Sequence, residues 1–274
     1  MLELTEAWRC QNLSIGFVPT MGALHEGHIA LFRRARAENQ KFVASIFVNP
    51  TQFLKGEDLE KYPRPFERDC SLLEQAGCDS LFFPAPEAMY QSNASTMVEV
   101  ESLSTQWEGA SRPGHFRGVA TIVAKLFNLV RAHRAYFGEK DFQQLKIIEA
   151  LSRDLNFDVE VVACATVREA DGLALSSRNE YLNRVERAAA PVIFRALQAA
   201  QTAVQDGEYS AVRLTQVIQE TLRNEPLIVE EYSAIVDSNS LEPLEVLDPK
   251  KPARALIAAR AGSTRLIDNV ALIT

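Results

Sequence analysis

The chain contains 274 residues, of which 47% are hydrophobic and 24% charged, and it carries a formal net charge of −7 at pH 7. This acidic balance argues against a general nucleic-acid binder, which needs a basic face, but it permits a small anionic substrate, because a few local cations dominate within a screening length of about 10 Å. No apolar run approaches the roughly 20 residues of a membrane span and the N-terminus lacks the features of a signal segment, so we expect a cytoplasmic protein without membrane contact.

Patterns typical of strands and helices alternate through the first two thirds of the chain. Apolar runs predict strands over residues 14–20, 42–48, 80–83, 135–137 and 159–166, with a weaker one over 97–100. Helical spacing of apolar residues predicts helices over 29–39, 67–75, 119–130 and 142–155. The run over 42–48 is almost wholly apolar, which is typical of a strand buried on both faces of a parallel sheet. We therefore predict an α/β fold, a Rossmann-like doubly wound parallel sheet with right-handed crossovers.

The pattern changes after residue 179. Helices are predicted over 185–205 and 211–223, and strands over 231–237, 253–260 and 264–273, the last two joined by a hairpin turn at Gly262 and Ser263. These elements predict a second, smaller α+β domain. We place the boundary near Thr166, which gives domains over 1–166 and 167–274.

Four loops follow the carboxyl ends of predicted strands, over 19–28, 49–53, 138–141 and 166–179. Ligands bind at this edge of open α/β sheets. The first loop lies in F-V-P-T-M-G-A-L-H-E-G-H and holds two of the four histidines, His25 and His28. A turn from a strand into a helix offers backbone N–H groups and the positive end of the helix dipole to a phosphate. An isolated histidine here would more simply be a satisfied polar residue of the turn, but the pair favours phosphate binding.

Two later loops also carry residues suited to phosphate. In G-E-K-D (138–141), Lys140 can reach a phosphate and Asp141 can cap the next helix or accept from a hydroxyl. A capping Asp beside a solvated Lys is an equally good interpretation. The segment L-S-S-R-N (175–179) offers two hydroxyls and a guanidinium, and a mobile loop of this kind can close on a bound triphosphate. An ordinary domain-linking loop explains it equally well.

The loop over 49–53 and the four cysteines are the remaining candidates for binding or chemistry. Asn49 and Gln52 are neutral amides, which suit the recognition of hydroxyl or carboxylate groups, although a simple turn also accounts for them. The four cysteines form no C-x-x-C pair, and this favours isolated thiols in a reducing compartment over metal ligands or disulfides.

Five segments, in their order along the chain, resemble the pantothenate synthetase (pantoate–β-alanine ligase) family. They are P-T-M-G-A-L-H-E-G-H, F-V-N-P-T-Q-F, R-P-G-H-F-R-G-V-A-T, Y-F-G-E-K-D-F-Q-Q-L and R-E-A-D-G-L-A-L-S-S-R-N-E-Y-L. The resemblance extends from about residue 15 to the end, and the family belongs to the superfamily of nucleotidylyl transferases and class I aminoacyl-tRNA synthetases. It implies a step in pantothenate and coenzyme A biosynthesis. ATP and (R)-pantoate would give a pantoyl adenylate and pyrophosphate, and β-alanine would then displace AMP to form pantothenate.

The resemblance also implies a role for each matching residue. His28, His25 and Lys140 would be catalytic. The implied ATP-binding residues are Met21, Gly22, Ala23, Leu24, His25, Glu26, Gly27, His28, Gly138, Glu139, Lys140, Asp141, Val167, Leu175, Ser176, Ser177 and Arg178. The implied pantoate pocket contains Gln52, also near β-alanine, and Gln144, with Asn49, Arg112 and His115 as weaker candidates. Mg²⁺ would arrive with ATP, bound through phosphates and water rather than through protein ligands.

We expect a homodimer whose first domain binds nucleotide and pantoate and whose second domain carries the phosphate-binding loop. Two departures from the family pattern stand out. The segment before the histidines is shorter than usual, which predicts a reduced or absent first helix, and Leu175 stands where methionine is also common, a volume-similar exchange. Two rival functions remain: a nucleotidylyl transferase that stops at an adenylated or cytidylylated product, and a catalytically silent nucleotide-binding module.

Overall fold

Five parallel strands form the larger of two sheets. They are β1 (Ile15–Thr20), β2 (Lys41–Ile46), β3 (Ser80–Phe82), β4 (Arg134–Gly138) and β5 (Glu160–Cys164), in the order β3-β2-β1-β4-β5. Every neighbouring pair is parallel, as the alternation of strands and helices predicted. β1 occupies the centre of the sheet, and its Ile15, Phe17 and Val18 are fully buried. The prediction of a doubly wound parallel sheet is therefore confirmed.

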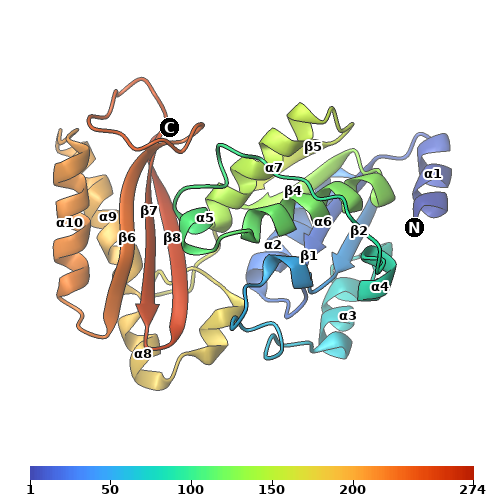
Figure 1. Ribbon diagram of the computed structural model, residues 1–274, viewed down its shortest axis with the longest axis horizontal. Helices are drawn as coiled ribbons and strands as arrows, with labels where there is room; N and C mark the ends of the chain where they lie inside the picture. Colours follow the sequence, from blue (N-terminus) through green and yellow to red (C-terminus); the bar gives the residue numbers. More distant parts are fainter. The chain divides into compact units, whose positions relative to one another are not determined.

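The computed structural model describes residues 1–274 and divides the chain into two compact units (Figure 1). The first unit comprises Met1–Glu139 and Gln143–Ala165, and the second comprises Lys140–Phe142 and Thr166–Thr274. The domain boundary at residue 166 stays a prediction. The structure adds that Lys140–Phe142, which continue directly from β4, belong with the second unit.

Helices on both faces of the parallel sheet complete the first unit. The longer ones are α1 (Leu2–Cys10), α2 (Glu26–Glu38), α3 (Phe66–Gln75), α6 (His115–Val130) and α7 (Phe142–Asp154). The short ones are α4 (Pro86–Met89), α5 (Glu108–Ser111), η1 (Pro50–Gln52) and η2 (Glu139–Asp141), the last extending into the second unit. Among the helices of the structure, none is both long enough and apolar enough to cross a membrane.

One local prediction for the first unit is wrong, and another is narrowed. The expected strand over 97–100 does not form, because the backbone N–H of Val98 donates to the Thr121 hydroxyl (2.9 Å) instead of to a neighbouring strand. The first helix, expected to be reduced or absent, is not absent: it is present as the nine-residue α1 and is tied to the rest of the unit, and its reduced length stays a prediction. Its Arg9 contacts Asp158 at 2.8 Å, and its Glu6 contacts Arg131 at 2.6 Å.

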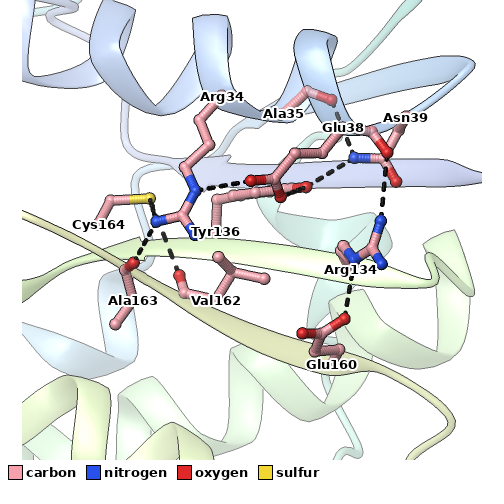
Figure 2. Close-up of polar contacts among 10 residues, drawn as sticks. All are labelled: Arg34, Ala35, Glu38, Asn39, Arg134, Tyr136, Glu160, Val162, Ala163 and Cys164. Carbon is pink, nitrogen blue, oxygen red and sulfur yellow. Dashed lines mark hydrogen bonds and ion pairs between the residues drawn. The ribbon is translucent and has the colours of Figure 1, made fainter.

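A polar network fixes the C-terminal end of α2 to the sheet (Figure 2). The Tyr136 hydroxyl of β4 donates to the Glu38 carboxylate (2.8 Å) and accepts from the Asn39 side chain (2.7 Å). Arg34, one turn earlier, donates to the carbonyl of Ala163 on β5 (2.6 Å). Burial and the Glu38 carboxylate raise the pKa of Tyr136, so the hydroxyl keeps its proton. Since α2 has 13 residues and spans about 20 Å, this network also fixes where its other end lies.

The second unit pairs an antiparallel sheet with helices. The strands β6 (Ile228–Asp237), β7 (Ala253–Ala261) and β8 (Thr264–Ile273) lie in chain order. The helices are α8 (Arg184–Ala189), α9 (Val192–Gln205) and α10 (Ala211–Arg223), with the short η3 (Ser177–Tyr181) before them. The predicted single helix over 185–205 is interrupted at Pro191, which lacks the N–H that a continuous helix needs.

The core of the second unit lies between the sheet and α9 and α10, which cover one of its faces (Figure 1). The helices supply Ile193, Leu197, Leu214 and Ile218, and the strands supply alternate residues of β7, among them Ala255 and Ile257. Alternation along a strand directs successive side chains to opposite faces, so Arg254 and Leu256 point away from this core.

Candidate functional site

The turn between β1 and α2 is held by a carboxylate that sequence reasoning missed. Asp69 of α3 is buried and accepts hydrogen bonds from the backbone N–H groups of Ala23 (2.8 Å) and Leu24 (2.9 Å). The N–H of Gly22 donates to the Thr20 hydroxyl (3.1 Å), and Gly22 itself has φ +83°, which favours glycine. The backbone N–H groups of Gly22, Ala23 and Leu24 are thus already used by the protein, as buried N–H groups must be.

His25 and His28 cap the start of α2 with each other's help. The Nδ1 atom of His25 accepts from the backbone N–H of Gly27 (3.1 Å), and the Nδ1 atom of His28 accepts from the backbone N–H of His25 (3.3 Å). An imidazole nitrogen that accepts a hydrogen bond carries no proton, so each neutral ring holds its proton on Nε2. The ring centroids lie 4.2 Å apart. The arrangement therefore leaves the proton of each ring on Nε2 at the positive end of a helix, and an N–H group at such a place suits anionic oxygens.

Asn49 is fully engaged inside the first unit. It is 1% exposed. Its amide group donates to the Gln52 side-chain oxygen (3.0 Å) and to the Gly118 carbonyl (3.1 Å), while its oxygen accepts from the hydroxyls of Thr51 (3.0 Å) and Tyr90 (2.9 Å). These four bonds use every donor and acceptor position of the side chain. Asn49, predicted to bind substrate, is therefore placed to orient Gln52.

The contact with Asn49 decides which way the Gln52 amide faces. Its oxygen accepts from Asn49, so its Nε2 points the other way, toward the sulfur of Met21 at 3.0 Å. A thioether is a weak acceptor, and an oxygen-bearing ligand would be a stronger partner for this N–H group. Gln52 and Met21, both predicted site residues, therefore lie in contact, and the Nε2–H group of Gln52 points toward the Met21 side chain.

His115 and Arg112 lie behind Gln52. His115 is 7% exposed, and its Nδ1 lies 2.7 Å from the backbone carbonyl oxygen of Gln52, so Nδ1 carries the proton and donates it. Its Nε2 accepts from Arg112 (3.1 Å), whose guanidinium is held by the Glu57 carboxylate through two contacts of 2.7 Å. Burial first and Arg112 second lower the pKa of His115 to about 4. These two weaker pocket candidates therefore support the backbone of Gln52.

The two adjacent glutamines of α7 differ in their surroundings. Gln143 is buried and holds the segment before α5, donating to the carbonyls of Leu103 (2.7 Å) and Gln106 (2.8 Å) and accepting from the N–H of Glu108 (3.0 Å). Gln144, the predicted pantoate ligand, is half-buried. The sequence motif Q-Q therefore contains one structural residue and one candidate for binding.

Lys140 and Asp141 follow β4 but belong to the second unit. The Lys140 ammonium lies 3.9 Å from the Asp141 carboxylate, too far for a strong hydrogen bond. The backbone carbonyl of Lys140 accepts from the side chain of Asn269 on β8 (2.9 Å). Gly138 precedes this segment in the first unit, and no protein atom lies within 4 Å of the place where a Cβ would stand.

The predicted phosphate-binding loop begins as a short hairpin in the second unit. The N–H of Leu175 donates to the Val167 carbonyl (3.0 Å), and Arg168 pairs with Ala174. Ser176 caps the short helix η3 by accepting from the N–H of Arg178 (3.3 Å), so its hydroxyl oxygen is already hydrogen-bonded. Ser176, Ser177 and Arg178 follow directly after the second arm of this hairpin.

The predicted site residues divide between the two units. The first unit contains Met21–His28, Asn49, Gln52, Arg112, His115, Gly138, Glu139 and Gln144, and the second contains Lys140, Asp141, Val167 and Leu175–Arg178. No group of three or more His, Cys, Asp or Glu side chains is placed to hold a metal ion. All four cysteines are free thiols, and burial raises the pKa of Cys78 and Cys164.

Comparison with known proteins places these residues in a family. The model of the family described as Pantoate-beta-alanine ligase matches residues 1–271. A pantothenate synthetase of Rubrobacter xylanophilus is 54% identical and aligns over 98% of this chain and 95% of its own length. The pantothenate synthetase of Thermotoga neapolitana is 50% identical over 99% of this chain and 96% of its own.

Solved structures agree with the sequence comparison. A crystal structure of pantothenate synthetase from Thermus thermophilus superposes with a TM-score of 0.92 at 50% identity, over 98% of both chains. Pantoate-beta-alanine ligase from Francisella tularensis, solved with beta-gamma ATP and beta-alanine, superposes with a TM-score of 0.80 at 33% identity, over 99% of this chain and 95% of its own.

Proposed function

The chain belongs to the pantoate–β-alanine ligase family and condenses pantoate with β-alanine at the expense of ATP, and we propose that it does so through a pantoyl adenylate. In the first step a pantoate carboxylate oxygen attacks the α-phosphorus, and the bond to the β-phosphate oxygen breaks to release pyrophosphate. In the second step the amine of β-alanine attacks the acyl carbon, and AMP leaves. The Francisella tularensis relative, solved with beta-gamma ATP and beta-alanine, supports ATP and β-alanine as substrates.

The histidine pair at the start of α2 carries this proposal. Negative charge grows on the phosphate oxygens and on the departing pyrophosphate, and fixed donors directed at those oxygens lower the barrier. The capping bonds leave His25 and His28 neutral, each with a proton on Nε2. Both histidines would therefore act as N–H donors, fixed by their capping bonds, to the oxygens on which the charge develops.

The remaining ATP contacts follow the family motifs. In this proposal Lys140 supplies a positive charge to the phosphates, and Ser176, Ser177 and Arg178 complete the phosphate contacts. Met21–Gly27, Gly138, Glu139 and Asp141 would line the nucleotide, and the backbone of Val167 would meet the adenine. In the second unit, the Ser176 hydroxyl already accepts from Arg178 N–H, so it would serve phosphate as a donor.

Pantoate selection is assigned to Gln52 and Gln144. The Nε2–H of Gln52, directed at Met21, would bind a pantoate oxygen in place of the weakly accepting sulfur. Asn49, with all four of its hydrogen-bonding positions engaged by the protein, would act by fixing the Gln52 amide rather than by touching pantoate. Mg²⁺ would be held mainly by the ATP phosphates and water, as is usual for this ion in nucleotide sites.

Pantoate-dependent exchange of labelled pyrophosphate into ATP tests the adenylate. We expect exchange in the absence of β-alanine, and release of AMP and pantothenate only when β-alanine is added. A single-step reaction would show no exchange without the amine. A nucleotidylyl transferase would accumulate a nucleotide adduct that β-alanine does not consume, and a silent nucleotide-binding module would show neither reaction.

The assembly and its location are also part of the proposal. We expect a homodimer in the cytoplasm. Light scattering coupled to gel filtration should give twice the chain mass of 30.5 kDa. A species of 30.5 kDa at micromolar concentration would contradict the dimer.

A further inference from the structure

One dipeptide of β8 contacts both of the second unit's predicted ATP-binding segments. Asn269 is 4% exposed, and its side-chain amide donates to the backbone carbonyl of Lys140 (2.9 Å). Asp268 is 5% exposed, and its carboxylate accepts from both terminal nitrogens of Arg168, at 2.6 and 2.9 Å. Lys140 and Arg168 are far from β8 in sequence, and neither contact is suggested by any motif.

The two contacts lie on opposite faces of the sheet. Asp268 pairs in register with Ile257, which belongs to the core shared with α9 and α10, whereas Asn269 pairs with Leu256, which does not. On the helix-covered face, the Arg168 guanidinium lies 3.8 Å above the Phe194 ring of α9. On the other face, Arg254 donates to the Asn269 oxygen (2.5 Å) and lies 3.7 Å above the Phe142 ring.

The Asn269 contact fixes a backbone atom, whereas the Asp268 contact fixes the guanidinium of Arg168. Asn269 holds Lys140 at its backbone carbonyl, and Arg254 holds the ring of Phe142, two residues later. The backbone from which the lysine side chain extends is therefore fixed. Arg168 donates to the Gly172 carbonyl (3.1 Å) as well as to Asp268, which closes the hairpin that leads to Ser176. A buried, bidentate Arg–carboxylate pair is both strong and geometrically specific.

We propose that Asp268 and Asn269 are positioning residues for the ligation, which hold Lys140 and the 167–179 hairpin at a fixed spacing through one strand. The inference rests on the proposed function, in which both segments bind ATP phosphates. It means that Lys140, although it follows β4 in sequence, keeps its position relative to the loop through β8. Neither residue touches the reacting atoms, and both act through the segments that they hold.

Asn269→Asp tests the lysine half in the full-length protein. The new carboxylate still accepts from Arg254 but sets an oxygen against the Lys140 carbonyl where an N–H stood. We expect the kcat of pantoate-dependent pyrophosphate exchange to fall roughly tenfold to a hundredfold, the usual effect of a small misplacement, while the KM for pantoate stays unchanged. The matched control is Asn239→Asp, the same exchange at an exposed turn of the second unit, which should leave both constants unchanged.

A double-mutant cycle with Lys140→Ala separates positioning from general damage. If Asn269 acts through Lys140, the double variant should be no slower than Lys140→Ala alone, because the side chain being positioned is absent. Independent, multiplicative losses would overturn the inference. Normal exchange by Lys140→Ala would instead remove Lys140 from the proposed function. If Lys140→Ala is impaired but Asn269→Asp is fully active, the inference about Asn269 is overturned while the proposed function of Lys140 stands.

Two further variants complete the test. One replaces Asn269→Asp if that variant does not fold, and the other tests the role of Asp268 in holding the 167–179 hairpin, the loop half of the inference. If circular dichroism shows that Asn269→Asp loses the sheet, Arg254→Met replaces it, since this change removes the donor to Asn269 and the cover of Phe142. It must reproduce the kcat loss and its non-additivity with Lys140→Ala, and a multiplicative loss overturns the inference. Asp268→Asn should raise the KM for ATP several-fold with pantoate KM unchanged. An unchanged KM for ATP overturns the loop half.

Discussion

The two units hold their predicted binding residues in different ways. In the first unit the histidine rings and the Gln52 amide are oriented by contacts that are short in sequence, His28 to His25 and Asn49 to Gln52, each three residues apart. Asp69 and His115 add remote contacts, but these hold the backbone of the same segments. In the second unit the key contacts are long: Asn269 lies 129 residues from Lys140, and Asp268 lies 100 from Arg168. Local contacts form with the turn that contains them, whereas the long contacts exist only once the antiparallel sheet has formed. The histidine and amide geometry should therefore withstand changes that displace Lys140.

The largest expected effect comes from removing one histidine donor. His28→Asn keeps an acceptor for the N–H of His25, so the start of α2 stays capped, but it deletes the Nε2–H group. We expect pyrophosphate exchange to fall about 10²–10³-fold, as for the loss of one fixed donor to a developing oxyanion. Steady-state exchange assays at saturating ATP and pantoate measure this.

The control for that variant is His133→Asn. His133 also accepts a backbone N–H at Nδ1, from Ile15 at 3.0 Å, but it precedes β4 at the amino end of the sheet. Exchange by His133→Asn should match the parent protein. Near-normal exchange by His28→Asn would remove His28 from the catalytic step.

Asp69 tests whether a remote contact also matters in the first unit. Asp69→Asn replaces one of two acceptor oxygens with a donor facing a buried N–H of Ala23 or Leu24. An unsatisfied buried N–H costs about 1–3 kcal/mol, so we expect the free energy of unfolding of the first unit to fall by that amount. Both tryptophans, Trp8 and Trp107, lie in this unit, so tryptophan fluorescence during urea unfolding reports its stability.

Asp154→Asn provides the reference for that measurement. Asp154 is 56% exposed at the end of α7 and contacts only its neighbour Arg153 among charged groups, so its loss should change stability by less than about 0.5 kcal/mol. Equal stability of Asp69→Asn and Asp154→Asn would show that Asp69 does not hold the turn.

Asp69 also marks the limit of what sequence patterns reveal. The parallel sheet followed from strand and helix periodicity, and the histidine turn followed from its place after a strand. Asp69 carries no such signal, because one acidic residue in the first turn of a helix is common and usually exposed. The same holds for Asp268 and Asn269, which stand in a strand that reads as ordinary alternation. Contacts between distant segments depend on packing, and a single sequence does not encode them as a local pattern.

The failed local predictions have the same origin. Residues 97–100 have strand composition, but Thr121 of α6 takes the N–H of Val98 that a ladder would need. The helix over 185–205 has continuous apolar spacing, and Pro191 alone interrupts it. The substrate role of Asn49, which the resemblance implied, stays a prediction, and only the structure shows the four partners that engage its side chain within the protein.

His115 makes the first unit sensitive to acid. Gln52, Arg112, Glu57, Glu108 and the Phe116 ring surround it, and burial and Arg112 lower its pKa to about 4. The unfolded chain binds a proton below about pH 6.5, whereas the folded protein does not until about pH 4. Stability is therefore constant above about pH 6.5 and falls as the pH drops toward 4, by roughly 2 kcal/mol at pH 5 from this group.

His115→Asn isolates that contribution. Asparagine can still donate to the Gln52 carbonyl but does not titrate. Urea unfolding followed by tryptophan fluorescence at pH 7.5 and pH 5.0 should show the parent losing about 2 kcal/mol more than the variant over this interval. The same difference between the two proteins at both pH values would mean that His115 takes up its proton without cost in the folded state.

Gln52→Ala gives the smallest expected effect. It contrasts a first-unit residue that affects the KM for pantoate with a second-unit residue, Asp268, that affects the KM for ATP. Loss of one hydrogen bond to substrate is worth about 1–1.5 kcal/mol, so we expect the KM for pantoate to rise roughly tenfold. The KM for ATP should stay unchanged, because Asn49 and His115 hold Gln52 through contacts within the first unit alone. Gln75→Ala, an exposed glutamine on α3, is the matched control. Asp268→Asn should show the opposite selectivity, with ATP affected and pantoate not. If Gln52→Ala raised the KM for ATP instead, the assignment of pantoate to Gln52 would be wrong.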